Sequence, residues 1–357
     1  MYQTQSLLRR QLCVRYPPAA GRIVLRTELD WDHDLDPVSV SGDGEASTFA
    51  LEARKPFLYF KVCLVAADGS VRWSVGPNML ALMTGDAGRD VHPCFEGSDT
   101  GSFSPVIERD SAILGRKHLL RVYLPPGYDE SVLRRYPVVY MQDGKNLFFP
   151  DEAFQGRDWQ VNEALGLLDA MNAVDRAIVV GIHSGDRMNE YTKPGYEAYA
   201  RSVVEEIVPE VARRFRLFDS PRETAVMGSS LGGVVSFYMA WQYPGVFGYA
   251  ACMSSTFSHK DDLIDRVLAE PRSTAKFYLD SGWPGDNYEV TLAMAMALSH
   301  RGYRVREDYL HLAFPLDEHD ERAWGKRLHL PLQLGLGQTS TASRRGASGT
   351  ARDQETA

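Results

Sequence analysis

The stretch AVMGSSLGGVVSF, residues 225–237, places two serines and three glycines between two apolar runs. The apolar segment ETAVMG (223–228) that leads into it is typical of a buried strand. The segment LGGVVSFYMAWQYP (231–244) that follows has the pattern of a helix ending near its proline. The order strand, turn, helix is the context in which a serine can be held as a nucleophile.

Within this stretch the pattern Gly-x-Ser-x-Gly selects one serine. Gly228, Ser230 and Gly232 match it. In such a turn the serine backbone is strained, and the flanking positions must lack side chains that would collide with the strand and the helix. The sequence therefore predicts Ser230 as the nucleophile and Ser229 as its neighbour, with a plain glycine-rich turn as the alternative.

Strand-like and helix-like runs alternate over residues 118–336. HLLRVYLPP, YPVVYMQDG, RAIVVGIHSG, YAACMSS and AKFYLDSG have the composition of strands, and WQVNEALGLLDAMNA and YEAYARSVVEEIVPEVARRFR have helical periodicity. This alternation predicts an α/β domain with a mostly parallel sheet covered on both faces.

The chain before this domain has a different pattern. Residues 1–100 contain short β-like runs separated by turn signals such as SGDGE and AADGS, which predicts a small all-β sandwich. The polar segment 101–117 is interpreted as a linker. Residues 337–357 are rich in Ser, Thr, Gly and Ala, which predicts a disordered tail.

The composition of the chain excludes some classes of binding partner. The formal net charge of −8 argues against nucleic acid or an anionic membrane, and no segment has the length and apolarity of a membrane span or signal peptide. The four cysteines have no metal-binding spacing, so we expect reduced structural thiols. These features predict a soluble cytoplasmic protein that acts on a small molecule, with no cofactor or metal.

A serine nucleophile needs a base, and His319 is the predicted one. It lies in the polar segment PLDEHDERAW, after the final strand-like run and before a terminal helix. A histidine there would project over the sheet edge and could take the serine proton. His300 ends a helical pattern and His311 lies within a strand-like run, so both are interpreted as structural.

The acid that orients the histidine should follow the strand AKFYLDSG. Asp286 lies in the loop beyond Gly282, whereas Asp280 lies nearly within the strand. We prefer Asp286 and keep Asp280 as the alternative. Two backbone amides should hold the oxyanion, and the candidates are those of Leu231, directly after the nucleophile, and Lys145, after the Asp143–Gly144 turn.

Together the segments YMQDGKNLF, HSGDRMNEYT, MGSSLGG and DEHDERAW resemble the putative-esterase branch of the α/β hydrolases over residues 115–336. This branch includes enterochelin (ferric siderophore), feruloyl and acetylxylan esterases, S-formylglutathione hydrolase and the mycolyltransferases. The resemblance implies that Ser230 and His319 are the nucleophile and the base, with no cofactor. It also places Arg187, Glu190 and Tyr191 in a loop near the active site, where they bind substrate, or where Arg187 and Glu190 form a loop-fixing ion pair.

Two tryptophans have alternative interpretations. Trp159 either lines the substrate pocket or belongs to the core. The N-terminal module resembles the immunoglobulin-type sandwiches of starch-binding modules and of enterochelin esterases, and the resemblance implies that Trp73 and Asn78 contact a sugar, with Trp31 as a second aromatic platform. In the alternative, Trp73 fills the sandwich core and the module only shapes the esterase pocket.

The leading hypothesis is a serine esterase that acts on a siderophore-like or acyl-sugar ester through Ser230, His319 and Asp286. Acyl transfer to an alcohol would use the same residues. A glycan-binding protein with a hydrolase-fold scaffold is the hypothesis from another functional class.

Overall fold

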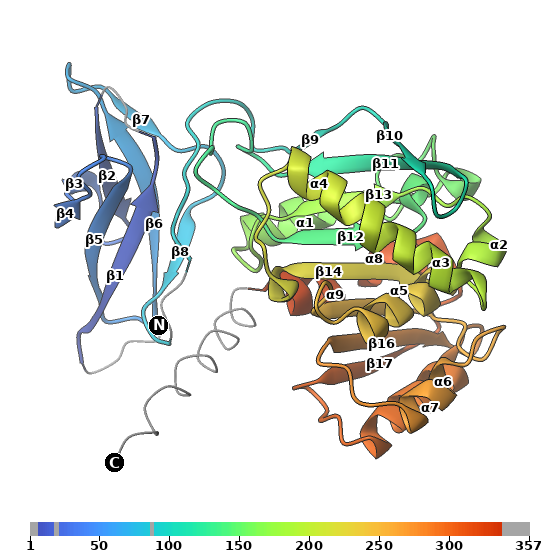
Figure 1. Cartoon of the computed structure of the whole chain (residues 1–357). Coiled ribbons are helices and arrows are strands. Elements are labelled where there is room, and N and C mark those ends of the chain that lie inside the picture. The colour runs from blue at the N-terminus through green and yellow to red at the C-terminus, as the bar shows by residue number, and fades with distance from the viewer. Residues whose placement is uncertain (1–5, 18–20, 86–88, 338–357) are drawn as a thin grey trace, which may run out of the picture.

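The computed structural model describes residues 6–17, 21–85 and 89–337, which form a small β module and a larger α/β domain (Figure 1). The domain resembles an α/β hydrolase, as the sequence predicts.

Two antiparallel sheets make up the N-terminal module, with strand orders β1-β5-β4 and β3-β2-β6-β7, and β8 pairs with β6. The strands are β1 (Leu8–Arg15), β2 (Arg22–Thr27), β3 (Asp30–Leu35), β4 (Ser39–Val40), β5 (Ala46–Ala53), β6 (Phe57–Val65), β7 (Val71–Trp73) and β8 (Met79–Leu82). Phe49 and Leu51 of β5 alternate with more exposed residues and share a buried cluster with Phe60 and Val62 of β6. Alternation of this kind buries one face of each sheet, and the predicted all-β module is confirmed.

The main sheet has nine strands in the order β10-β11-β13-β12-β14-β15-β16-β17, with β9 also paired to β11. Its strands are β9 (Ser102–Phe103), β10 (Ile107–Ser111), β11 (Arg116–Leu124), β12 (Val138–Met141), β13 (Ile178–Ile182), β14 (Thr224–Ser229), β15 (Tyr249–Met253), β16 (Lys276–Trp283) and β17 (Tyr309–Pro315). The six strands from β12 to β17 run parallel, and the first three are antiparallel to their neighbours. The carboxyl ends of the parallel strands therefore meet at one edge.

Helices cover both faces of this sheet. They are α1 (Val161–Ala170), α2 (Arg187–Glu190), α3 (Gly195–Ser202), α4 (Val208–Arg214), α5 (Leu231–Gln242), α6 (Leu263–Ala269), α7 (Tyr288–His300), α8 (Glu321–Arg327) and α9 (His329–Leu336). Val138 and Tyr140 of β12 share a buried cluster with α3, α5, α6 and α7, whereas Val139 and Met141 share another with α1, α8 and α9. Because both faces are buried, the strands read as continuous apolar runs.

Two expectations about the chain's organisation differ from the structure. The segment 101–117 is not a free linker, because β9 and β10 pair with β11 and extend the main sheet. The three central residues of β10 are exposed, as is usual for an edge strand, and this explains the polar composition. The single helix expected over 196–216 contains a π-helical turn at Val203–Ile207 between α3 and α4.

The β module docks against the amino ends of the parallel strands. Glu130, in the loop before β12, accepts hydrogen bonds from the amides of Phe95 and Glu96 and from the Tyr16 hydroxyl. Asn172, between α1 and β13, bonds the backbone of Asn78 and Leu80. Ser230 follows the carboxyl end of β14, so the docked module does not border the nucleophile.

Candidate active site

Ser230 occupies the sharp turn between β14 and α5 that the sequence predicts. Its backbone has φ 56° and ψ −126°, and the residue is 9% exposed. A Cβ on Gly228 would lie 2.5 Å from the carbonyl carbon and oxygen of Gly232. Only glycine at position 228 allows the strand and the helix to approach this closely, so the local sequence determines where the hydroxyl stands.

Ser230, His319 and Asp286 form one hydrogen-bonded chain. The Nε2 atom of His319 lies 3.0 Å from the Ser230 Oγ, and its Nδ1 lies 2.7 Å from Asp286 Oδ1. Ser230 follows β14, Asp286 follows β16 and His319 follows β17, so the parallel sheet brings the three together at its carboxyl edge. In this geometry the imidazole can take a proton from the hydroxyl while the carboxylate fixes its orientation.

Asp286 has a complete set of hydrogen-bond donors. The amides of Gly282 and Asn287 donate to it, each at 2.7 Å, and the Ser254 hydroxyl also donates. Burial would raise the pKa of Asp286, but the hydrogen bonds from His319, Ser254 and the two amides outweigh burial and lower that pKa. Asp286 therefore stays ionised beside the histidine.

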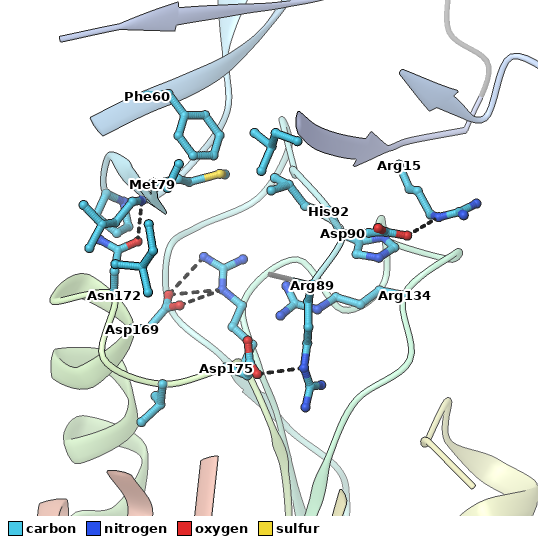
Figure 2. A pocket seen from close by; sticks show the side chains of 18 of the residues that line it. Arg15, Phe60, Met79, Arg89, Asp90, His92, Arg134, Asp169, Asn172 and Asp175 are labelled. Carbon is cyan, nitrogen blue, oxygen red and sulfur yellow. Dashed lines mark hydrogen bonds and ion pairs between the residues drawn. The ribbon is translucent and has the colours of Figure 1, made fainter. Parts of the chain in front are cut away.

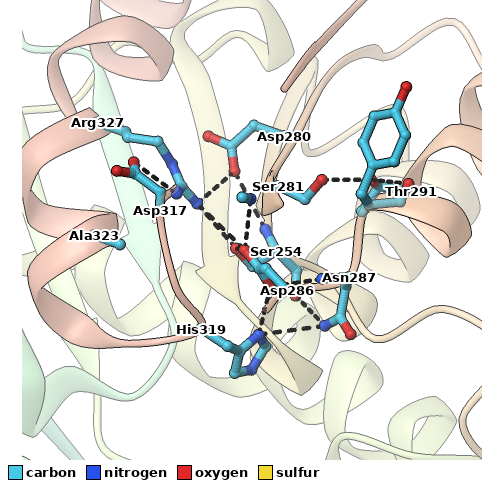
Figure 3. Close-up of polar contacts among 12 residues, drawn as sticks. Ser254, Asp280, Ser281, Asp286, Asn287, Thr291, Asp317, His319, Ala323 and Arg327 are labelled. Atoms are coloured by element: carbon cyan, nitrogen blue, oxygen red, sulfur yellow. Dashed lines mark hydrogen bonds and ion pairs between the residues drawn. The ribbon is translucent and has the colours of Figure 1, made fainter. Parts of the chain in front are cut away.

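Asp280, the alternative acid, belongs to a network behind Asp286 (Figure 3). Its Oδ1 accepts a hydrogen bond from Arg327 Nη2 at 3.1 Å, and its Oδ2 accepts one from the Tyr278 hydroxyl at 2.7 Å. Arg327 is 1% exposed and also donates to Ser254 Oγ at 2.9 Å. Burial raises the pKa of Asp280, and the Arg327 guanidinium opposes that shift.

Sequence reasoning missed Arg327 and Ser254. Ser254 directly follows β15, and it joins Arg327 to Asp286 through its single hydroxyl. The Arg327 Nη2 lies 3.9 Å from the Asp286 carboxylate. A serine after the apolar run in YAACMSS is the signal that could have pointed to Ser254, and a lone arginine in a helix gives no signal for Arg327.

The two amides expected to hold an oxyanion stand at the carboxyl ends of the paired strands β12 and β14. Within the described ranges, neither the Leu231 amide nor the Lys145 amide donates a hydrogen bond. A Cβ on Gly232 would lie 3.1 Å from the Asp143 carboxylate, so the loop at 143–145 touches the serine turn. Two unsatisfied donors beside the nucleophile can bind developing negative charge.

Arg187 and Tyr191 contact this loop at Asp143. Arg187 binds both oxygens of Asp143 with N–O distances between 2.9 and 3.1 Å. Tyr191 is fully buried, and its hydroxyl accepts a hydrogen bond from the Asp143 amide at 3.4 Å. The alternative in which Arg187 and Glu190 form an ion pair is wrong, because Glu190 pairs with Arg116 on β11 instead.

Trp159 is buried in the core rather than exposed to a substrate. It is 1% exposed, and its ring lies 5.8 Å from that of Trp324. Trp324 meets the His319 ring edge-on with the centroids 5.0 Å apart. Trp159 thus packs against Trp324, which in turn contacts the His319 ring.

In the β module, Trp73 lies on the surface and Asn78 lies at the docking interface. Trp73 is 40% exposed, which excludes the alternative in which it fills the sandwich core. Its ring centroid is 6.4 Å from that of Trp31. The carbonyl of Asn78 accepts a hydrogen bond from Asn172 of the α/β domain. The structure brings Trp31 and Trp73 together, whereas Asn78 faces the other domain.

Across 6–17, 21–85 and 89–337, no group of three or more His, Cys, Asp or Glu side chains is arranged to hold a metal ion. In the same ranges no helix is long and apolar enough to cross a bilayer.

Comparison with known sequences gives one family and several relatives. The family model described as "Putative esterase" matches residues 111–329, more than half of the chain. The uncharacterized protein YjcH of Bacillus subtilis (strain 168) is 34% identical over 140 residues, which cover 38% of this chain and 54% of the relative. An endo-1,4-beta-xylanase/feruloyl esterase of Xylanibacter ruminicola is 27% identical over 201 residues, covering 54% of this chain and 26% of the relative. The chain thus spans about half of the first relative and about a quarter of the second.

Similar folds occur among solved structures. The enterobactin esterase FES from Shigella flexneri, solved in the presence of enterobactin, aligns with a TM-score of 0.53 and 13% identity over 94% of each chain. A ferulic acid esterase aligns with a TM-score of 0.57 and 17% identity, over 67% of this chain and 99% of its own. The likeness is one of fold, and in the Shigella protein it extends over nearly the whole chain.

Proposed function

Because this chain belongs to the Putative esterase family, we propose that it hydrolyses carboxylic esters through a triad of Ser230, His319 and Asp286. The observation that carries the proposal is the hydrogen-bonded chain from Ser230 Oγ to His319 at 3.0 Å and on to Asp286 at 2.7 Å. A hydroxyl is a weak nucleophile until a base in contact with it accepts its proton.

The reaction proceeds through an acyl-enzyme. Ser230 Oγ attacks the ester carbonyl as His319 Nε2 takes its proton, and the amides of Leu231 and Lys145 bind the resulting oxyanion. His319 returns the proton to the departing alcohol. A water molecule then attacks the acyl-serine by the same route and releases the acid.

The substrate we propose is an ester with a substantial apolar acid portion, such as a siderophore-like or acyl-sugar ester. Four large apolar side chains lie at or beyond the carboxyl ends of β12, β13, β16 and β17 and are exposed: Phe154 62%, Met188 48%, Trp283 50% and Leu316 83%. The names of the two relatives above, a feruloyl esterase and an enterobactin esterase, agree with this class. A hydrolysis panel of methyl ferulate, an acetylated xylan and enterobactin ranks the candidates, and a preference for acetyl over feruloyl esters contradicts the apolar class.

The experiment that tests the triad is Ser230→Ala, assayed on p-nitrophenyl acetate. We expect activity to fall to background while the unfolding transition is unchanged, because Ser230 is at the edge of the core and alanine fits its place. Ser229→Ala is the matched control and should retain activity, since Ser229 is the last residue of β14. Full residual activity in Ser230→Ala overturns the proposal.

A second candidate function, glycan binding by the β module, is favoured by the Trp31–Trp73 pair. Trp73 is exposed and Trp31 is partly exposed, and aromatic rings at a surface can stack on the faces of sugars. Pull-down on insoluble starch and cellulose tests it, and we expect Trp73→Ala to abolish retention without changing ester hydrolysis. Equal retention of both proteins, or of neither, rejects sugar binding at this pair.

A further inference from the structure

A cavity of about 410 Å³ lies between the β module and the amino ends of the main sheet (Figure 2). On the α/β side it is lined by residues just before β12, β13 and β14, among them Arg134, Arg176 and Phe218. Ser230 stands at the opposite end of β14, so this cavity is separate from the proposed active site. Its volume is in the range of pockets that hold small molecules.

The lining carries more positive than negative charge, although the whole chain has a formal net charge of −8. It contains three aspartates and six arginines, the latter being Arg10, Arg15, Arg89, Arg134, Arg135 and Arg176. A concentration of guanidinium groups in a hollow favours an anionic occupant.

Every aspartate of the lining already has an arginine partner. The pairs are Arg15 with Asp90 at 2.5 Å, Arg89 with Asp175 at 2.8 Å, and Arg176 with Asp169 at 3.0 Å. Arg135 donates to the carbonyl of Leu217. The three carboxylates are therefore engaged by Arg15, Arg89 and Arg176.

Arg134 is a further arginine of the lining and takes part in none of these contacts. Its guanidinium lies over the Tyr136 ring at 5.0 Å, and within the described ranges it has neither a hydrogen-bond acceptor nor a carboxylate partner. Burial lowers the pKa of Arg134, and the nearby Arg176 lowers it further. Arg134 is partly buried. A guanidinium that is partly removed from water and has no acceptor loses hydration, and an anion in the cavity would replace it.

His92 supplies a second unsatisfied group on the same side of the cavity, where Figure 2 places it near Arg134. Its Nδ1 is buried and, among the residues described, has no hydrogen-bond partner. Burial, followed by the positive charge of Arg134, lowers the pKa of His92 to about 4. The neutral imidazole can therefore donate one hydrogen bond beside the guanidinium.

The β module contributes an apolar part of the lining, which includes Leu12, Phe60, Met79 and Ala81. From the unpaired guanidinium, the neighbouring imidazole and this apolar wall, we propose that the cavity binds a small organic carboxylate with an apolar body. The carboxylate accepts two parallel hydrogen bonds from the Arg134 guanidinium and one from His92, and the apolar body lies against the β module.

Isothermal titration of the full chain with sodium cinnamate tests the site. We expect saturable binding to the wild-type protein and, in Arg134→Met, binding that is about tenfold or more weaker, because a charge-assisted bidentate contact is lost. Because Arg134 has no carboxylate partner, its substitution leaves no buried carboxylate unpaired, and the variant should fold. It should also hydrolyse p-nitrophenyl acetate at the wild-type rate, since Ser230 is at the other end of the sheet. Arg135→Met is the matched control and should bind like the wild type.

Arg134→Lys retains the charge but not the two parallel hydrogen bonds and should lose affinity to a smaller extent, which provides a measurement should the methionine variant unfold. Neutral cinnamamide and inorganic phosphate lack the charge and the apolar body respectively, and each should bind more weakly than cinnamate. The proposal is overturned if cinnamate shows no saturable binding, if cinnamamide or phosphate matches it, or if neither substitution of Arg134 weakens it.

Discussion

Asp286→Asn is the substitution that tests the proposed site most sharply, because Asp286 receives four hydrogen bonds and has none to donate. Its Oδ1 accepts from His319 and the Asn287 amide, and its Oδ2 accepts from the Gly282 amide and the Ser254 hydroxyl. An asparagine must place its NH₂ group against one of these two sets of donors.

With the NH₂ at the Oδ1 position, His319 has to offer Nδ1 as an acceptor and carry its proton on Nε2. That tautomer cannot take the proton of Ser230, 3.0 Å away. With the NH₂ at the Oδ2 position, the NH₂ group faces the Gly282 amide, whose nitrogen lies 2.7 Å from that position. Both groups are hydrogen-bond donors, so this orientation is also unfavourable. Loss of the orienting carboxylate in a serine triad lowers kcat by roughly 10⁴, or about 5 kcal/mol of transition-state stabilisation.

The assay is kcat and kcat/KM for p-nitrophenyl acetate at neutral pH, with Asp280→Asn as the matched control. Asp280 is equally buried but contacts Arg327 and Tyr278 rather than His319. Its substitution breaks a buried ion pair and should cost about 3 kcal/mol of folding free energy or more, while kcat falls by less than about tenfold. Equal loss of kcat in the two variants, or Asp286→Asn within tenfold of wild type, would refute the assignment of Asp286.

Two further predictions concern the loop at 143–145 and the buried histidines. In Gly144→Ala the new Cβ would lie 2.5 Å from the backbone of Gly181 and would displace the Lys145 amide. We therefore expect kcat to fall by about 10² or more while KM changes little. An unchanged kcat would contradict the role of that loop. Burial lowers the pKa of His118 in the folded chain to about 4. Between that pH and the ordinary histidine pKa, only the unfolded chain binds a proton at this residue. The free energy of unfolding therefore falls as the pH falls. We expect this histidine alone to cost about 2 kcal/mol of unfolding free energy between about pH 7 and pH 5. Urea titration of wild type and His118→Gln measures the difference, with the exposed His300→Gln as control; parallel pH profiles for all three proteins contradict it.

Local patterns predicted much of the fold and the proposed nucleophile. The strand, the turn and the helix around Ser230 are contiguous in sequence, and the close approach of Gly228 to Gly232 is a consequence of that local geometry. The order of Ser230, Asp286 and His319 follows from the strand order of the fold, so each could be proposed from the loop in which it lies. The apolar runs of the parallel sheet were likewise readable, because strands buried on both faces lack polar interruptions.

Partners that meet across the molecule could not be predicted in this way. Arg327 lies 73 positions after Ser254, and the two touch only because α8 packs over the carboxyl ends of β15 and β16. One alternative from the sequence paired Arg187 with Glu190, three residues away, but in the folded chain Arg187 pairs with Asp143 and Glu190 pairs with Arg116.

The amino-acid sequence by itself determined the two folding patterns, the serine turn and the order of the candidate triad, because these depend on spacing along one chain. The tertiary structure alone decided that Asp286 rather than Asp280 contacts His319, and that the β module docks at the amino ends of the strands. Both depend on which side chains the sheet brings within hydrogen-bond distance. The arginine-lined cavity has the same origin, since its walls come from two modules that share no local sequence pattern.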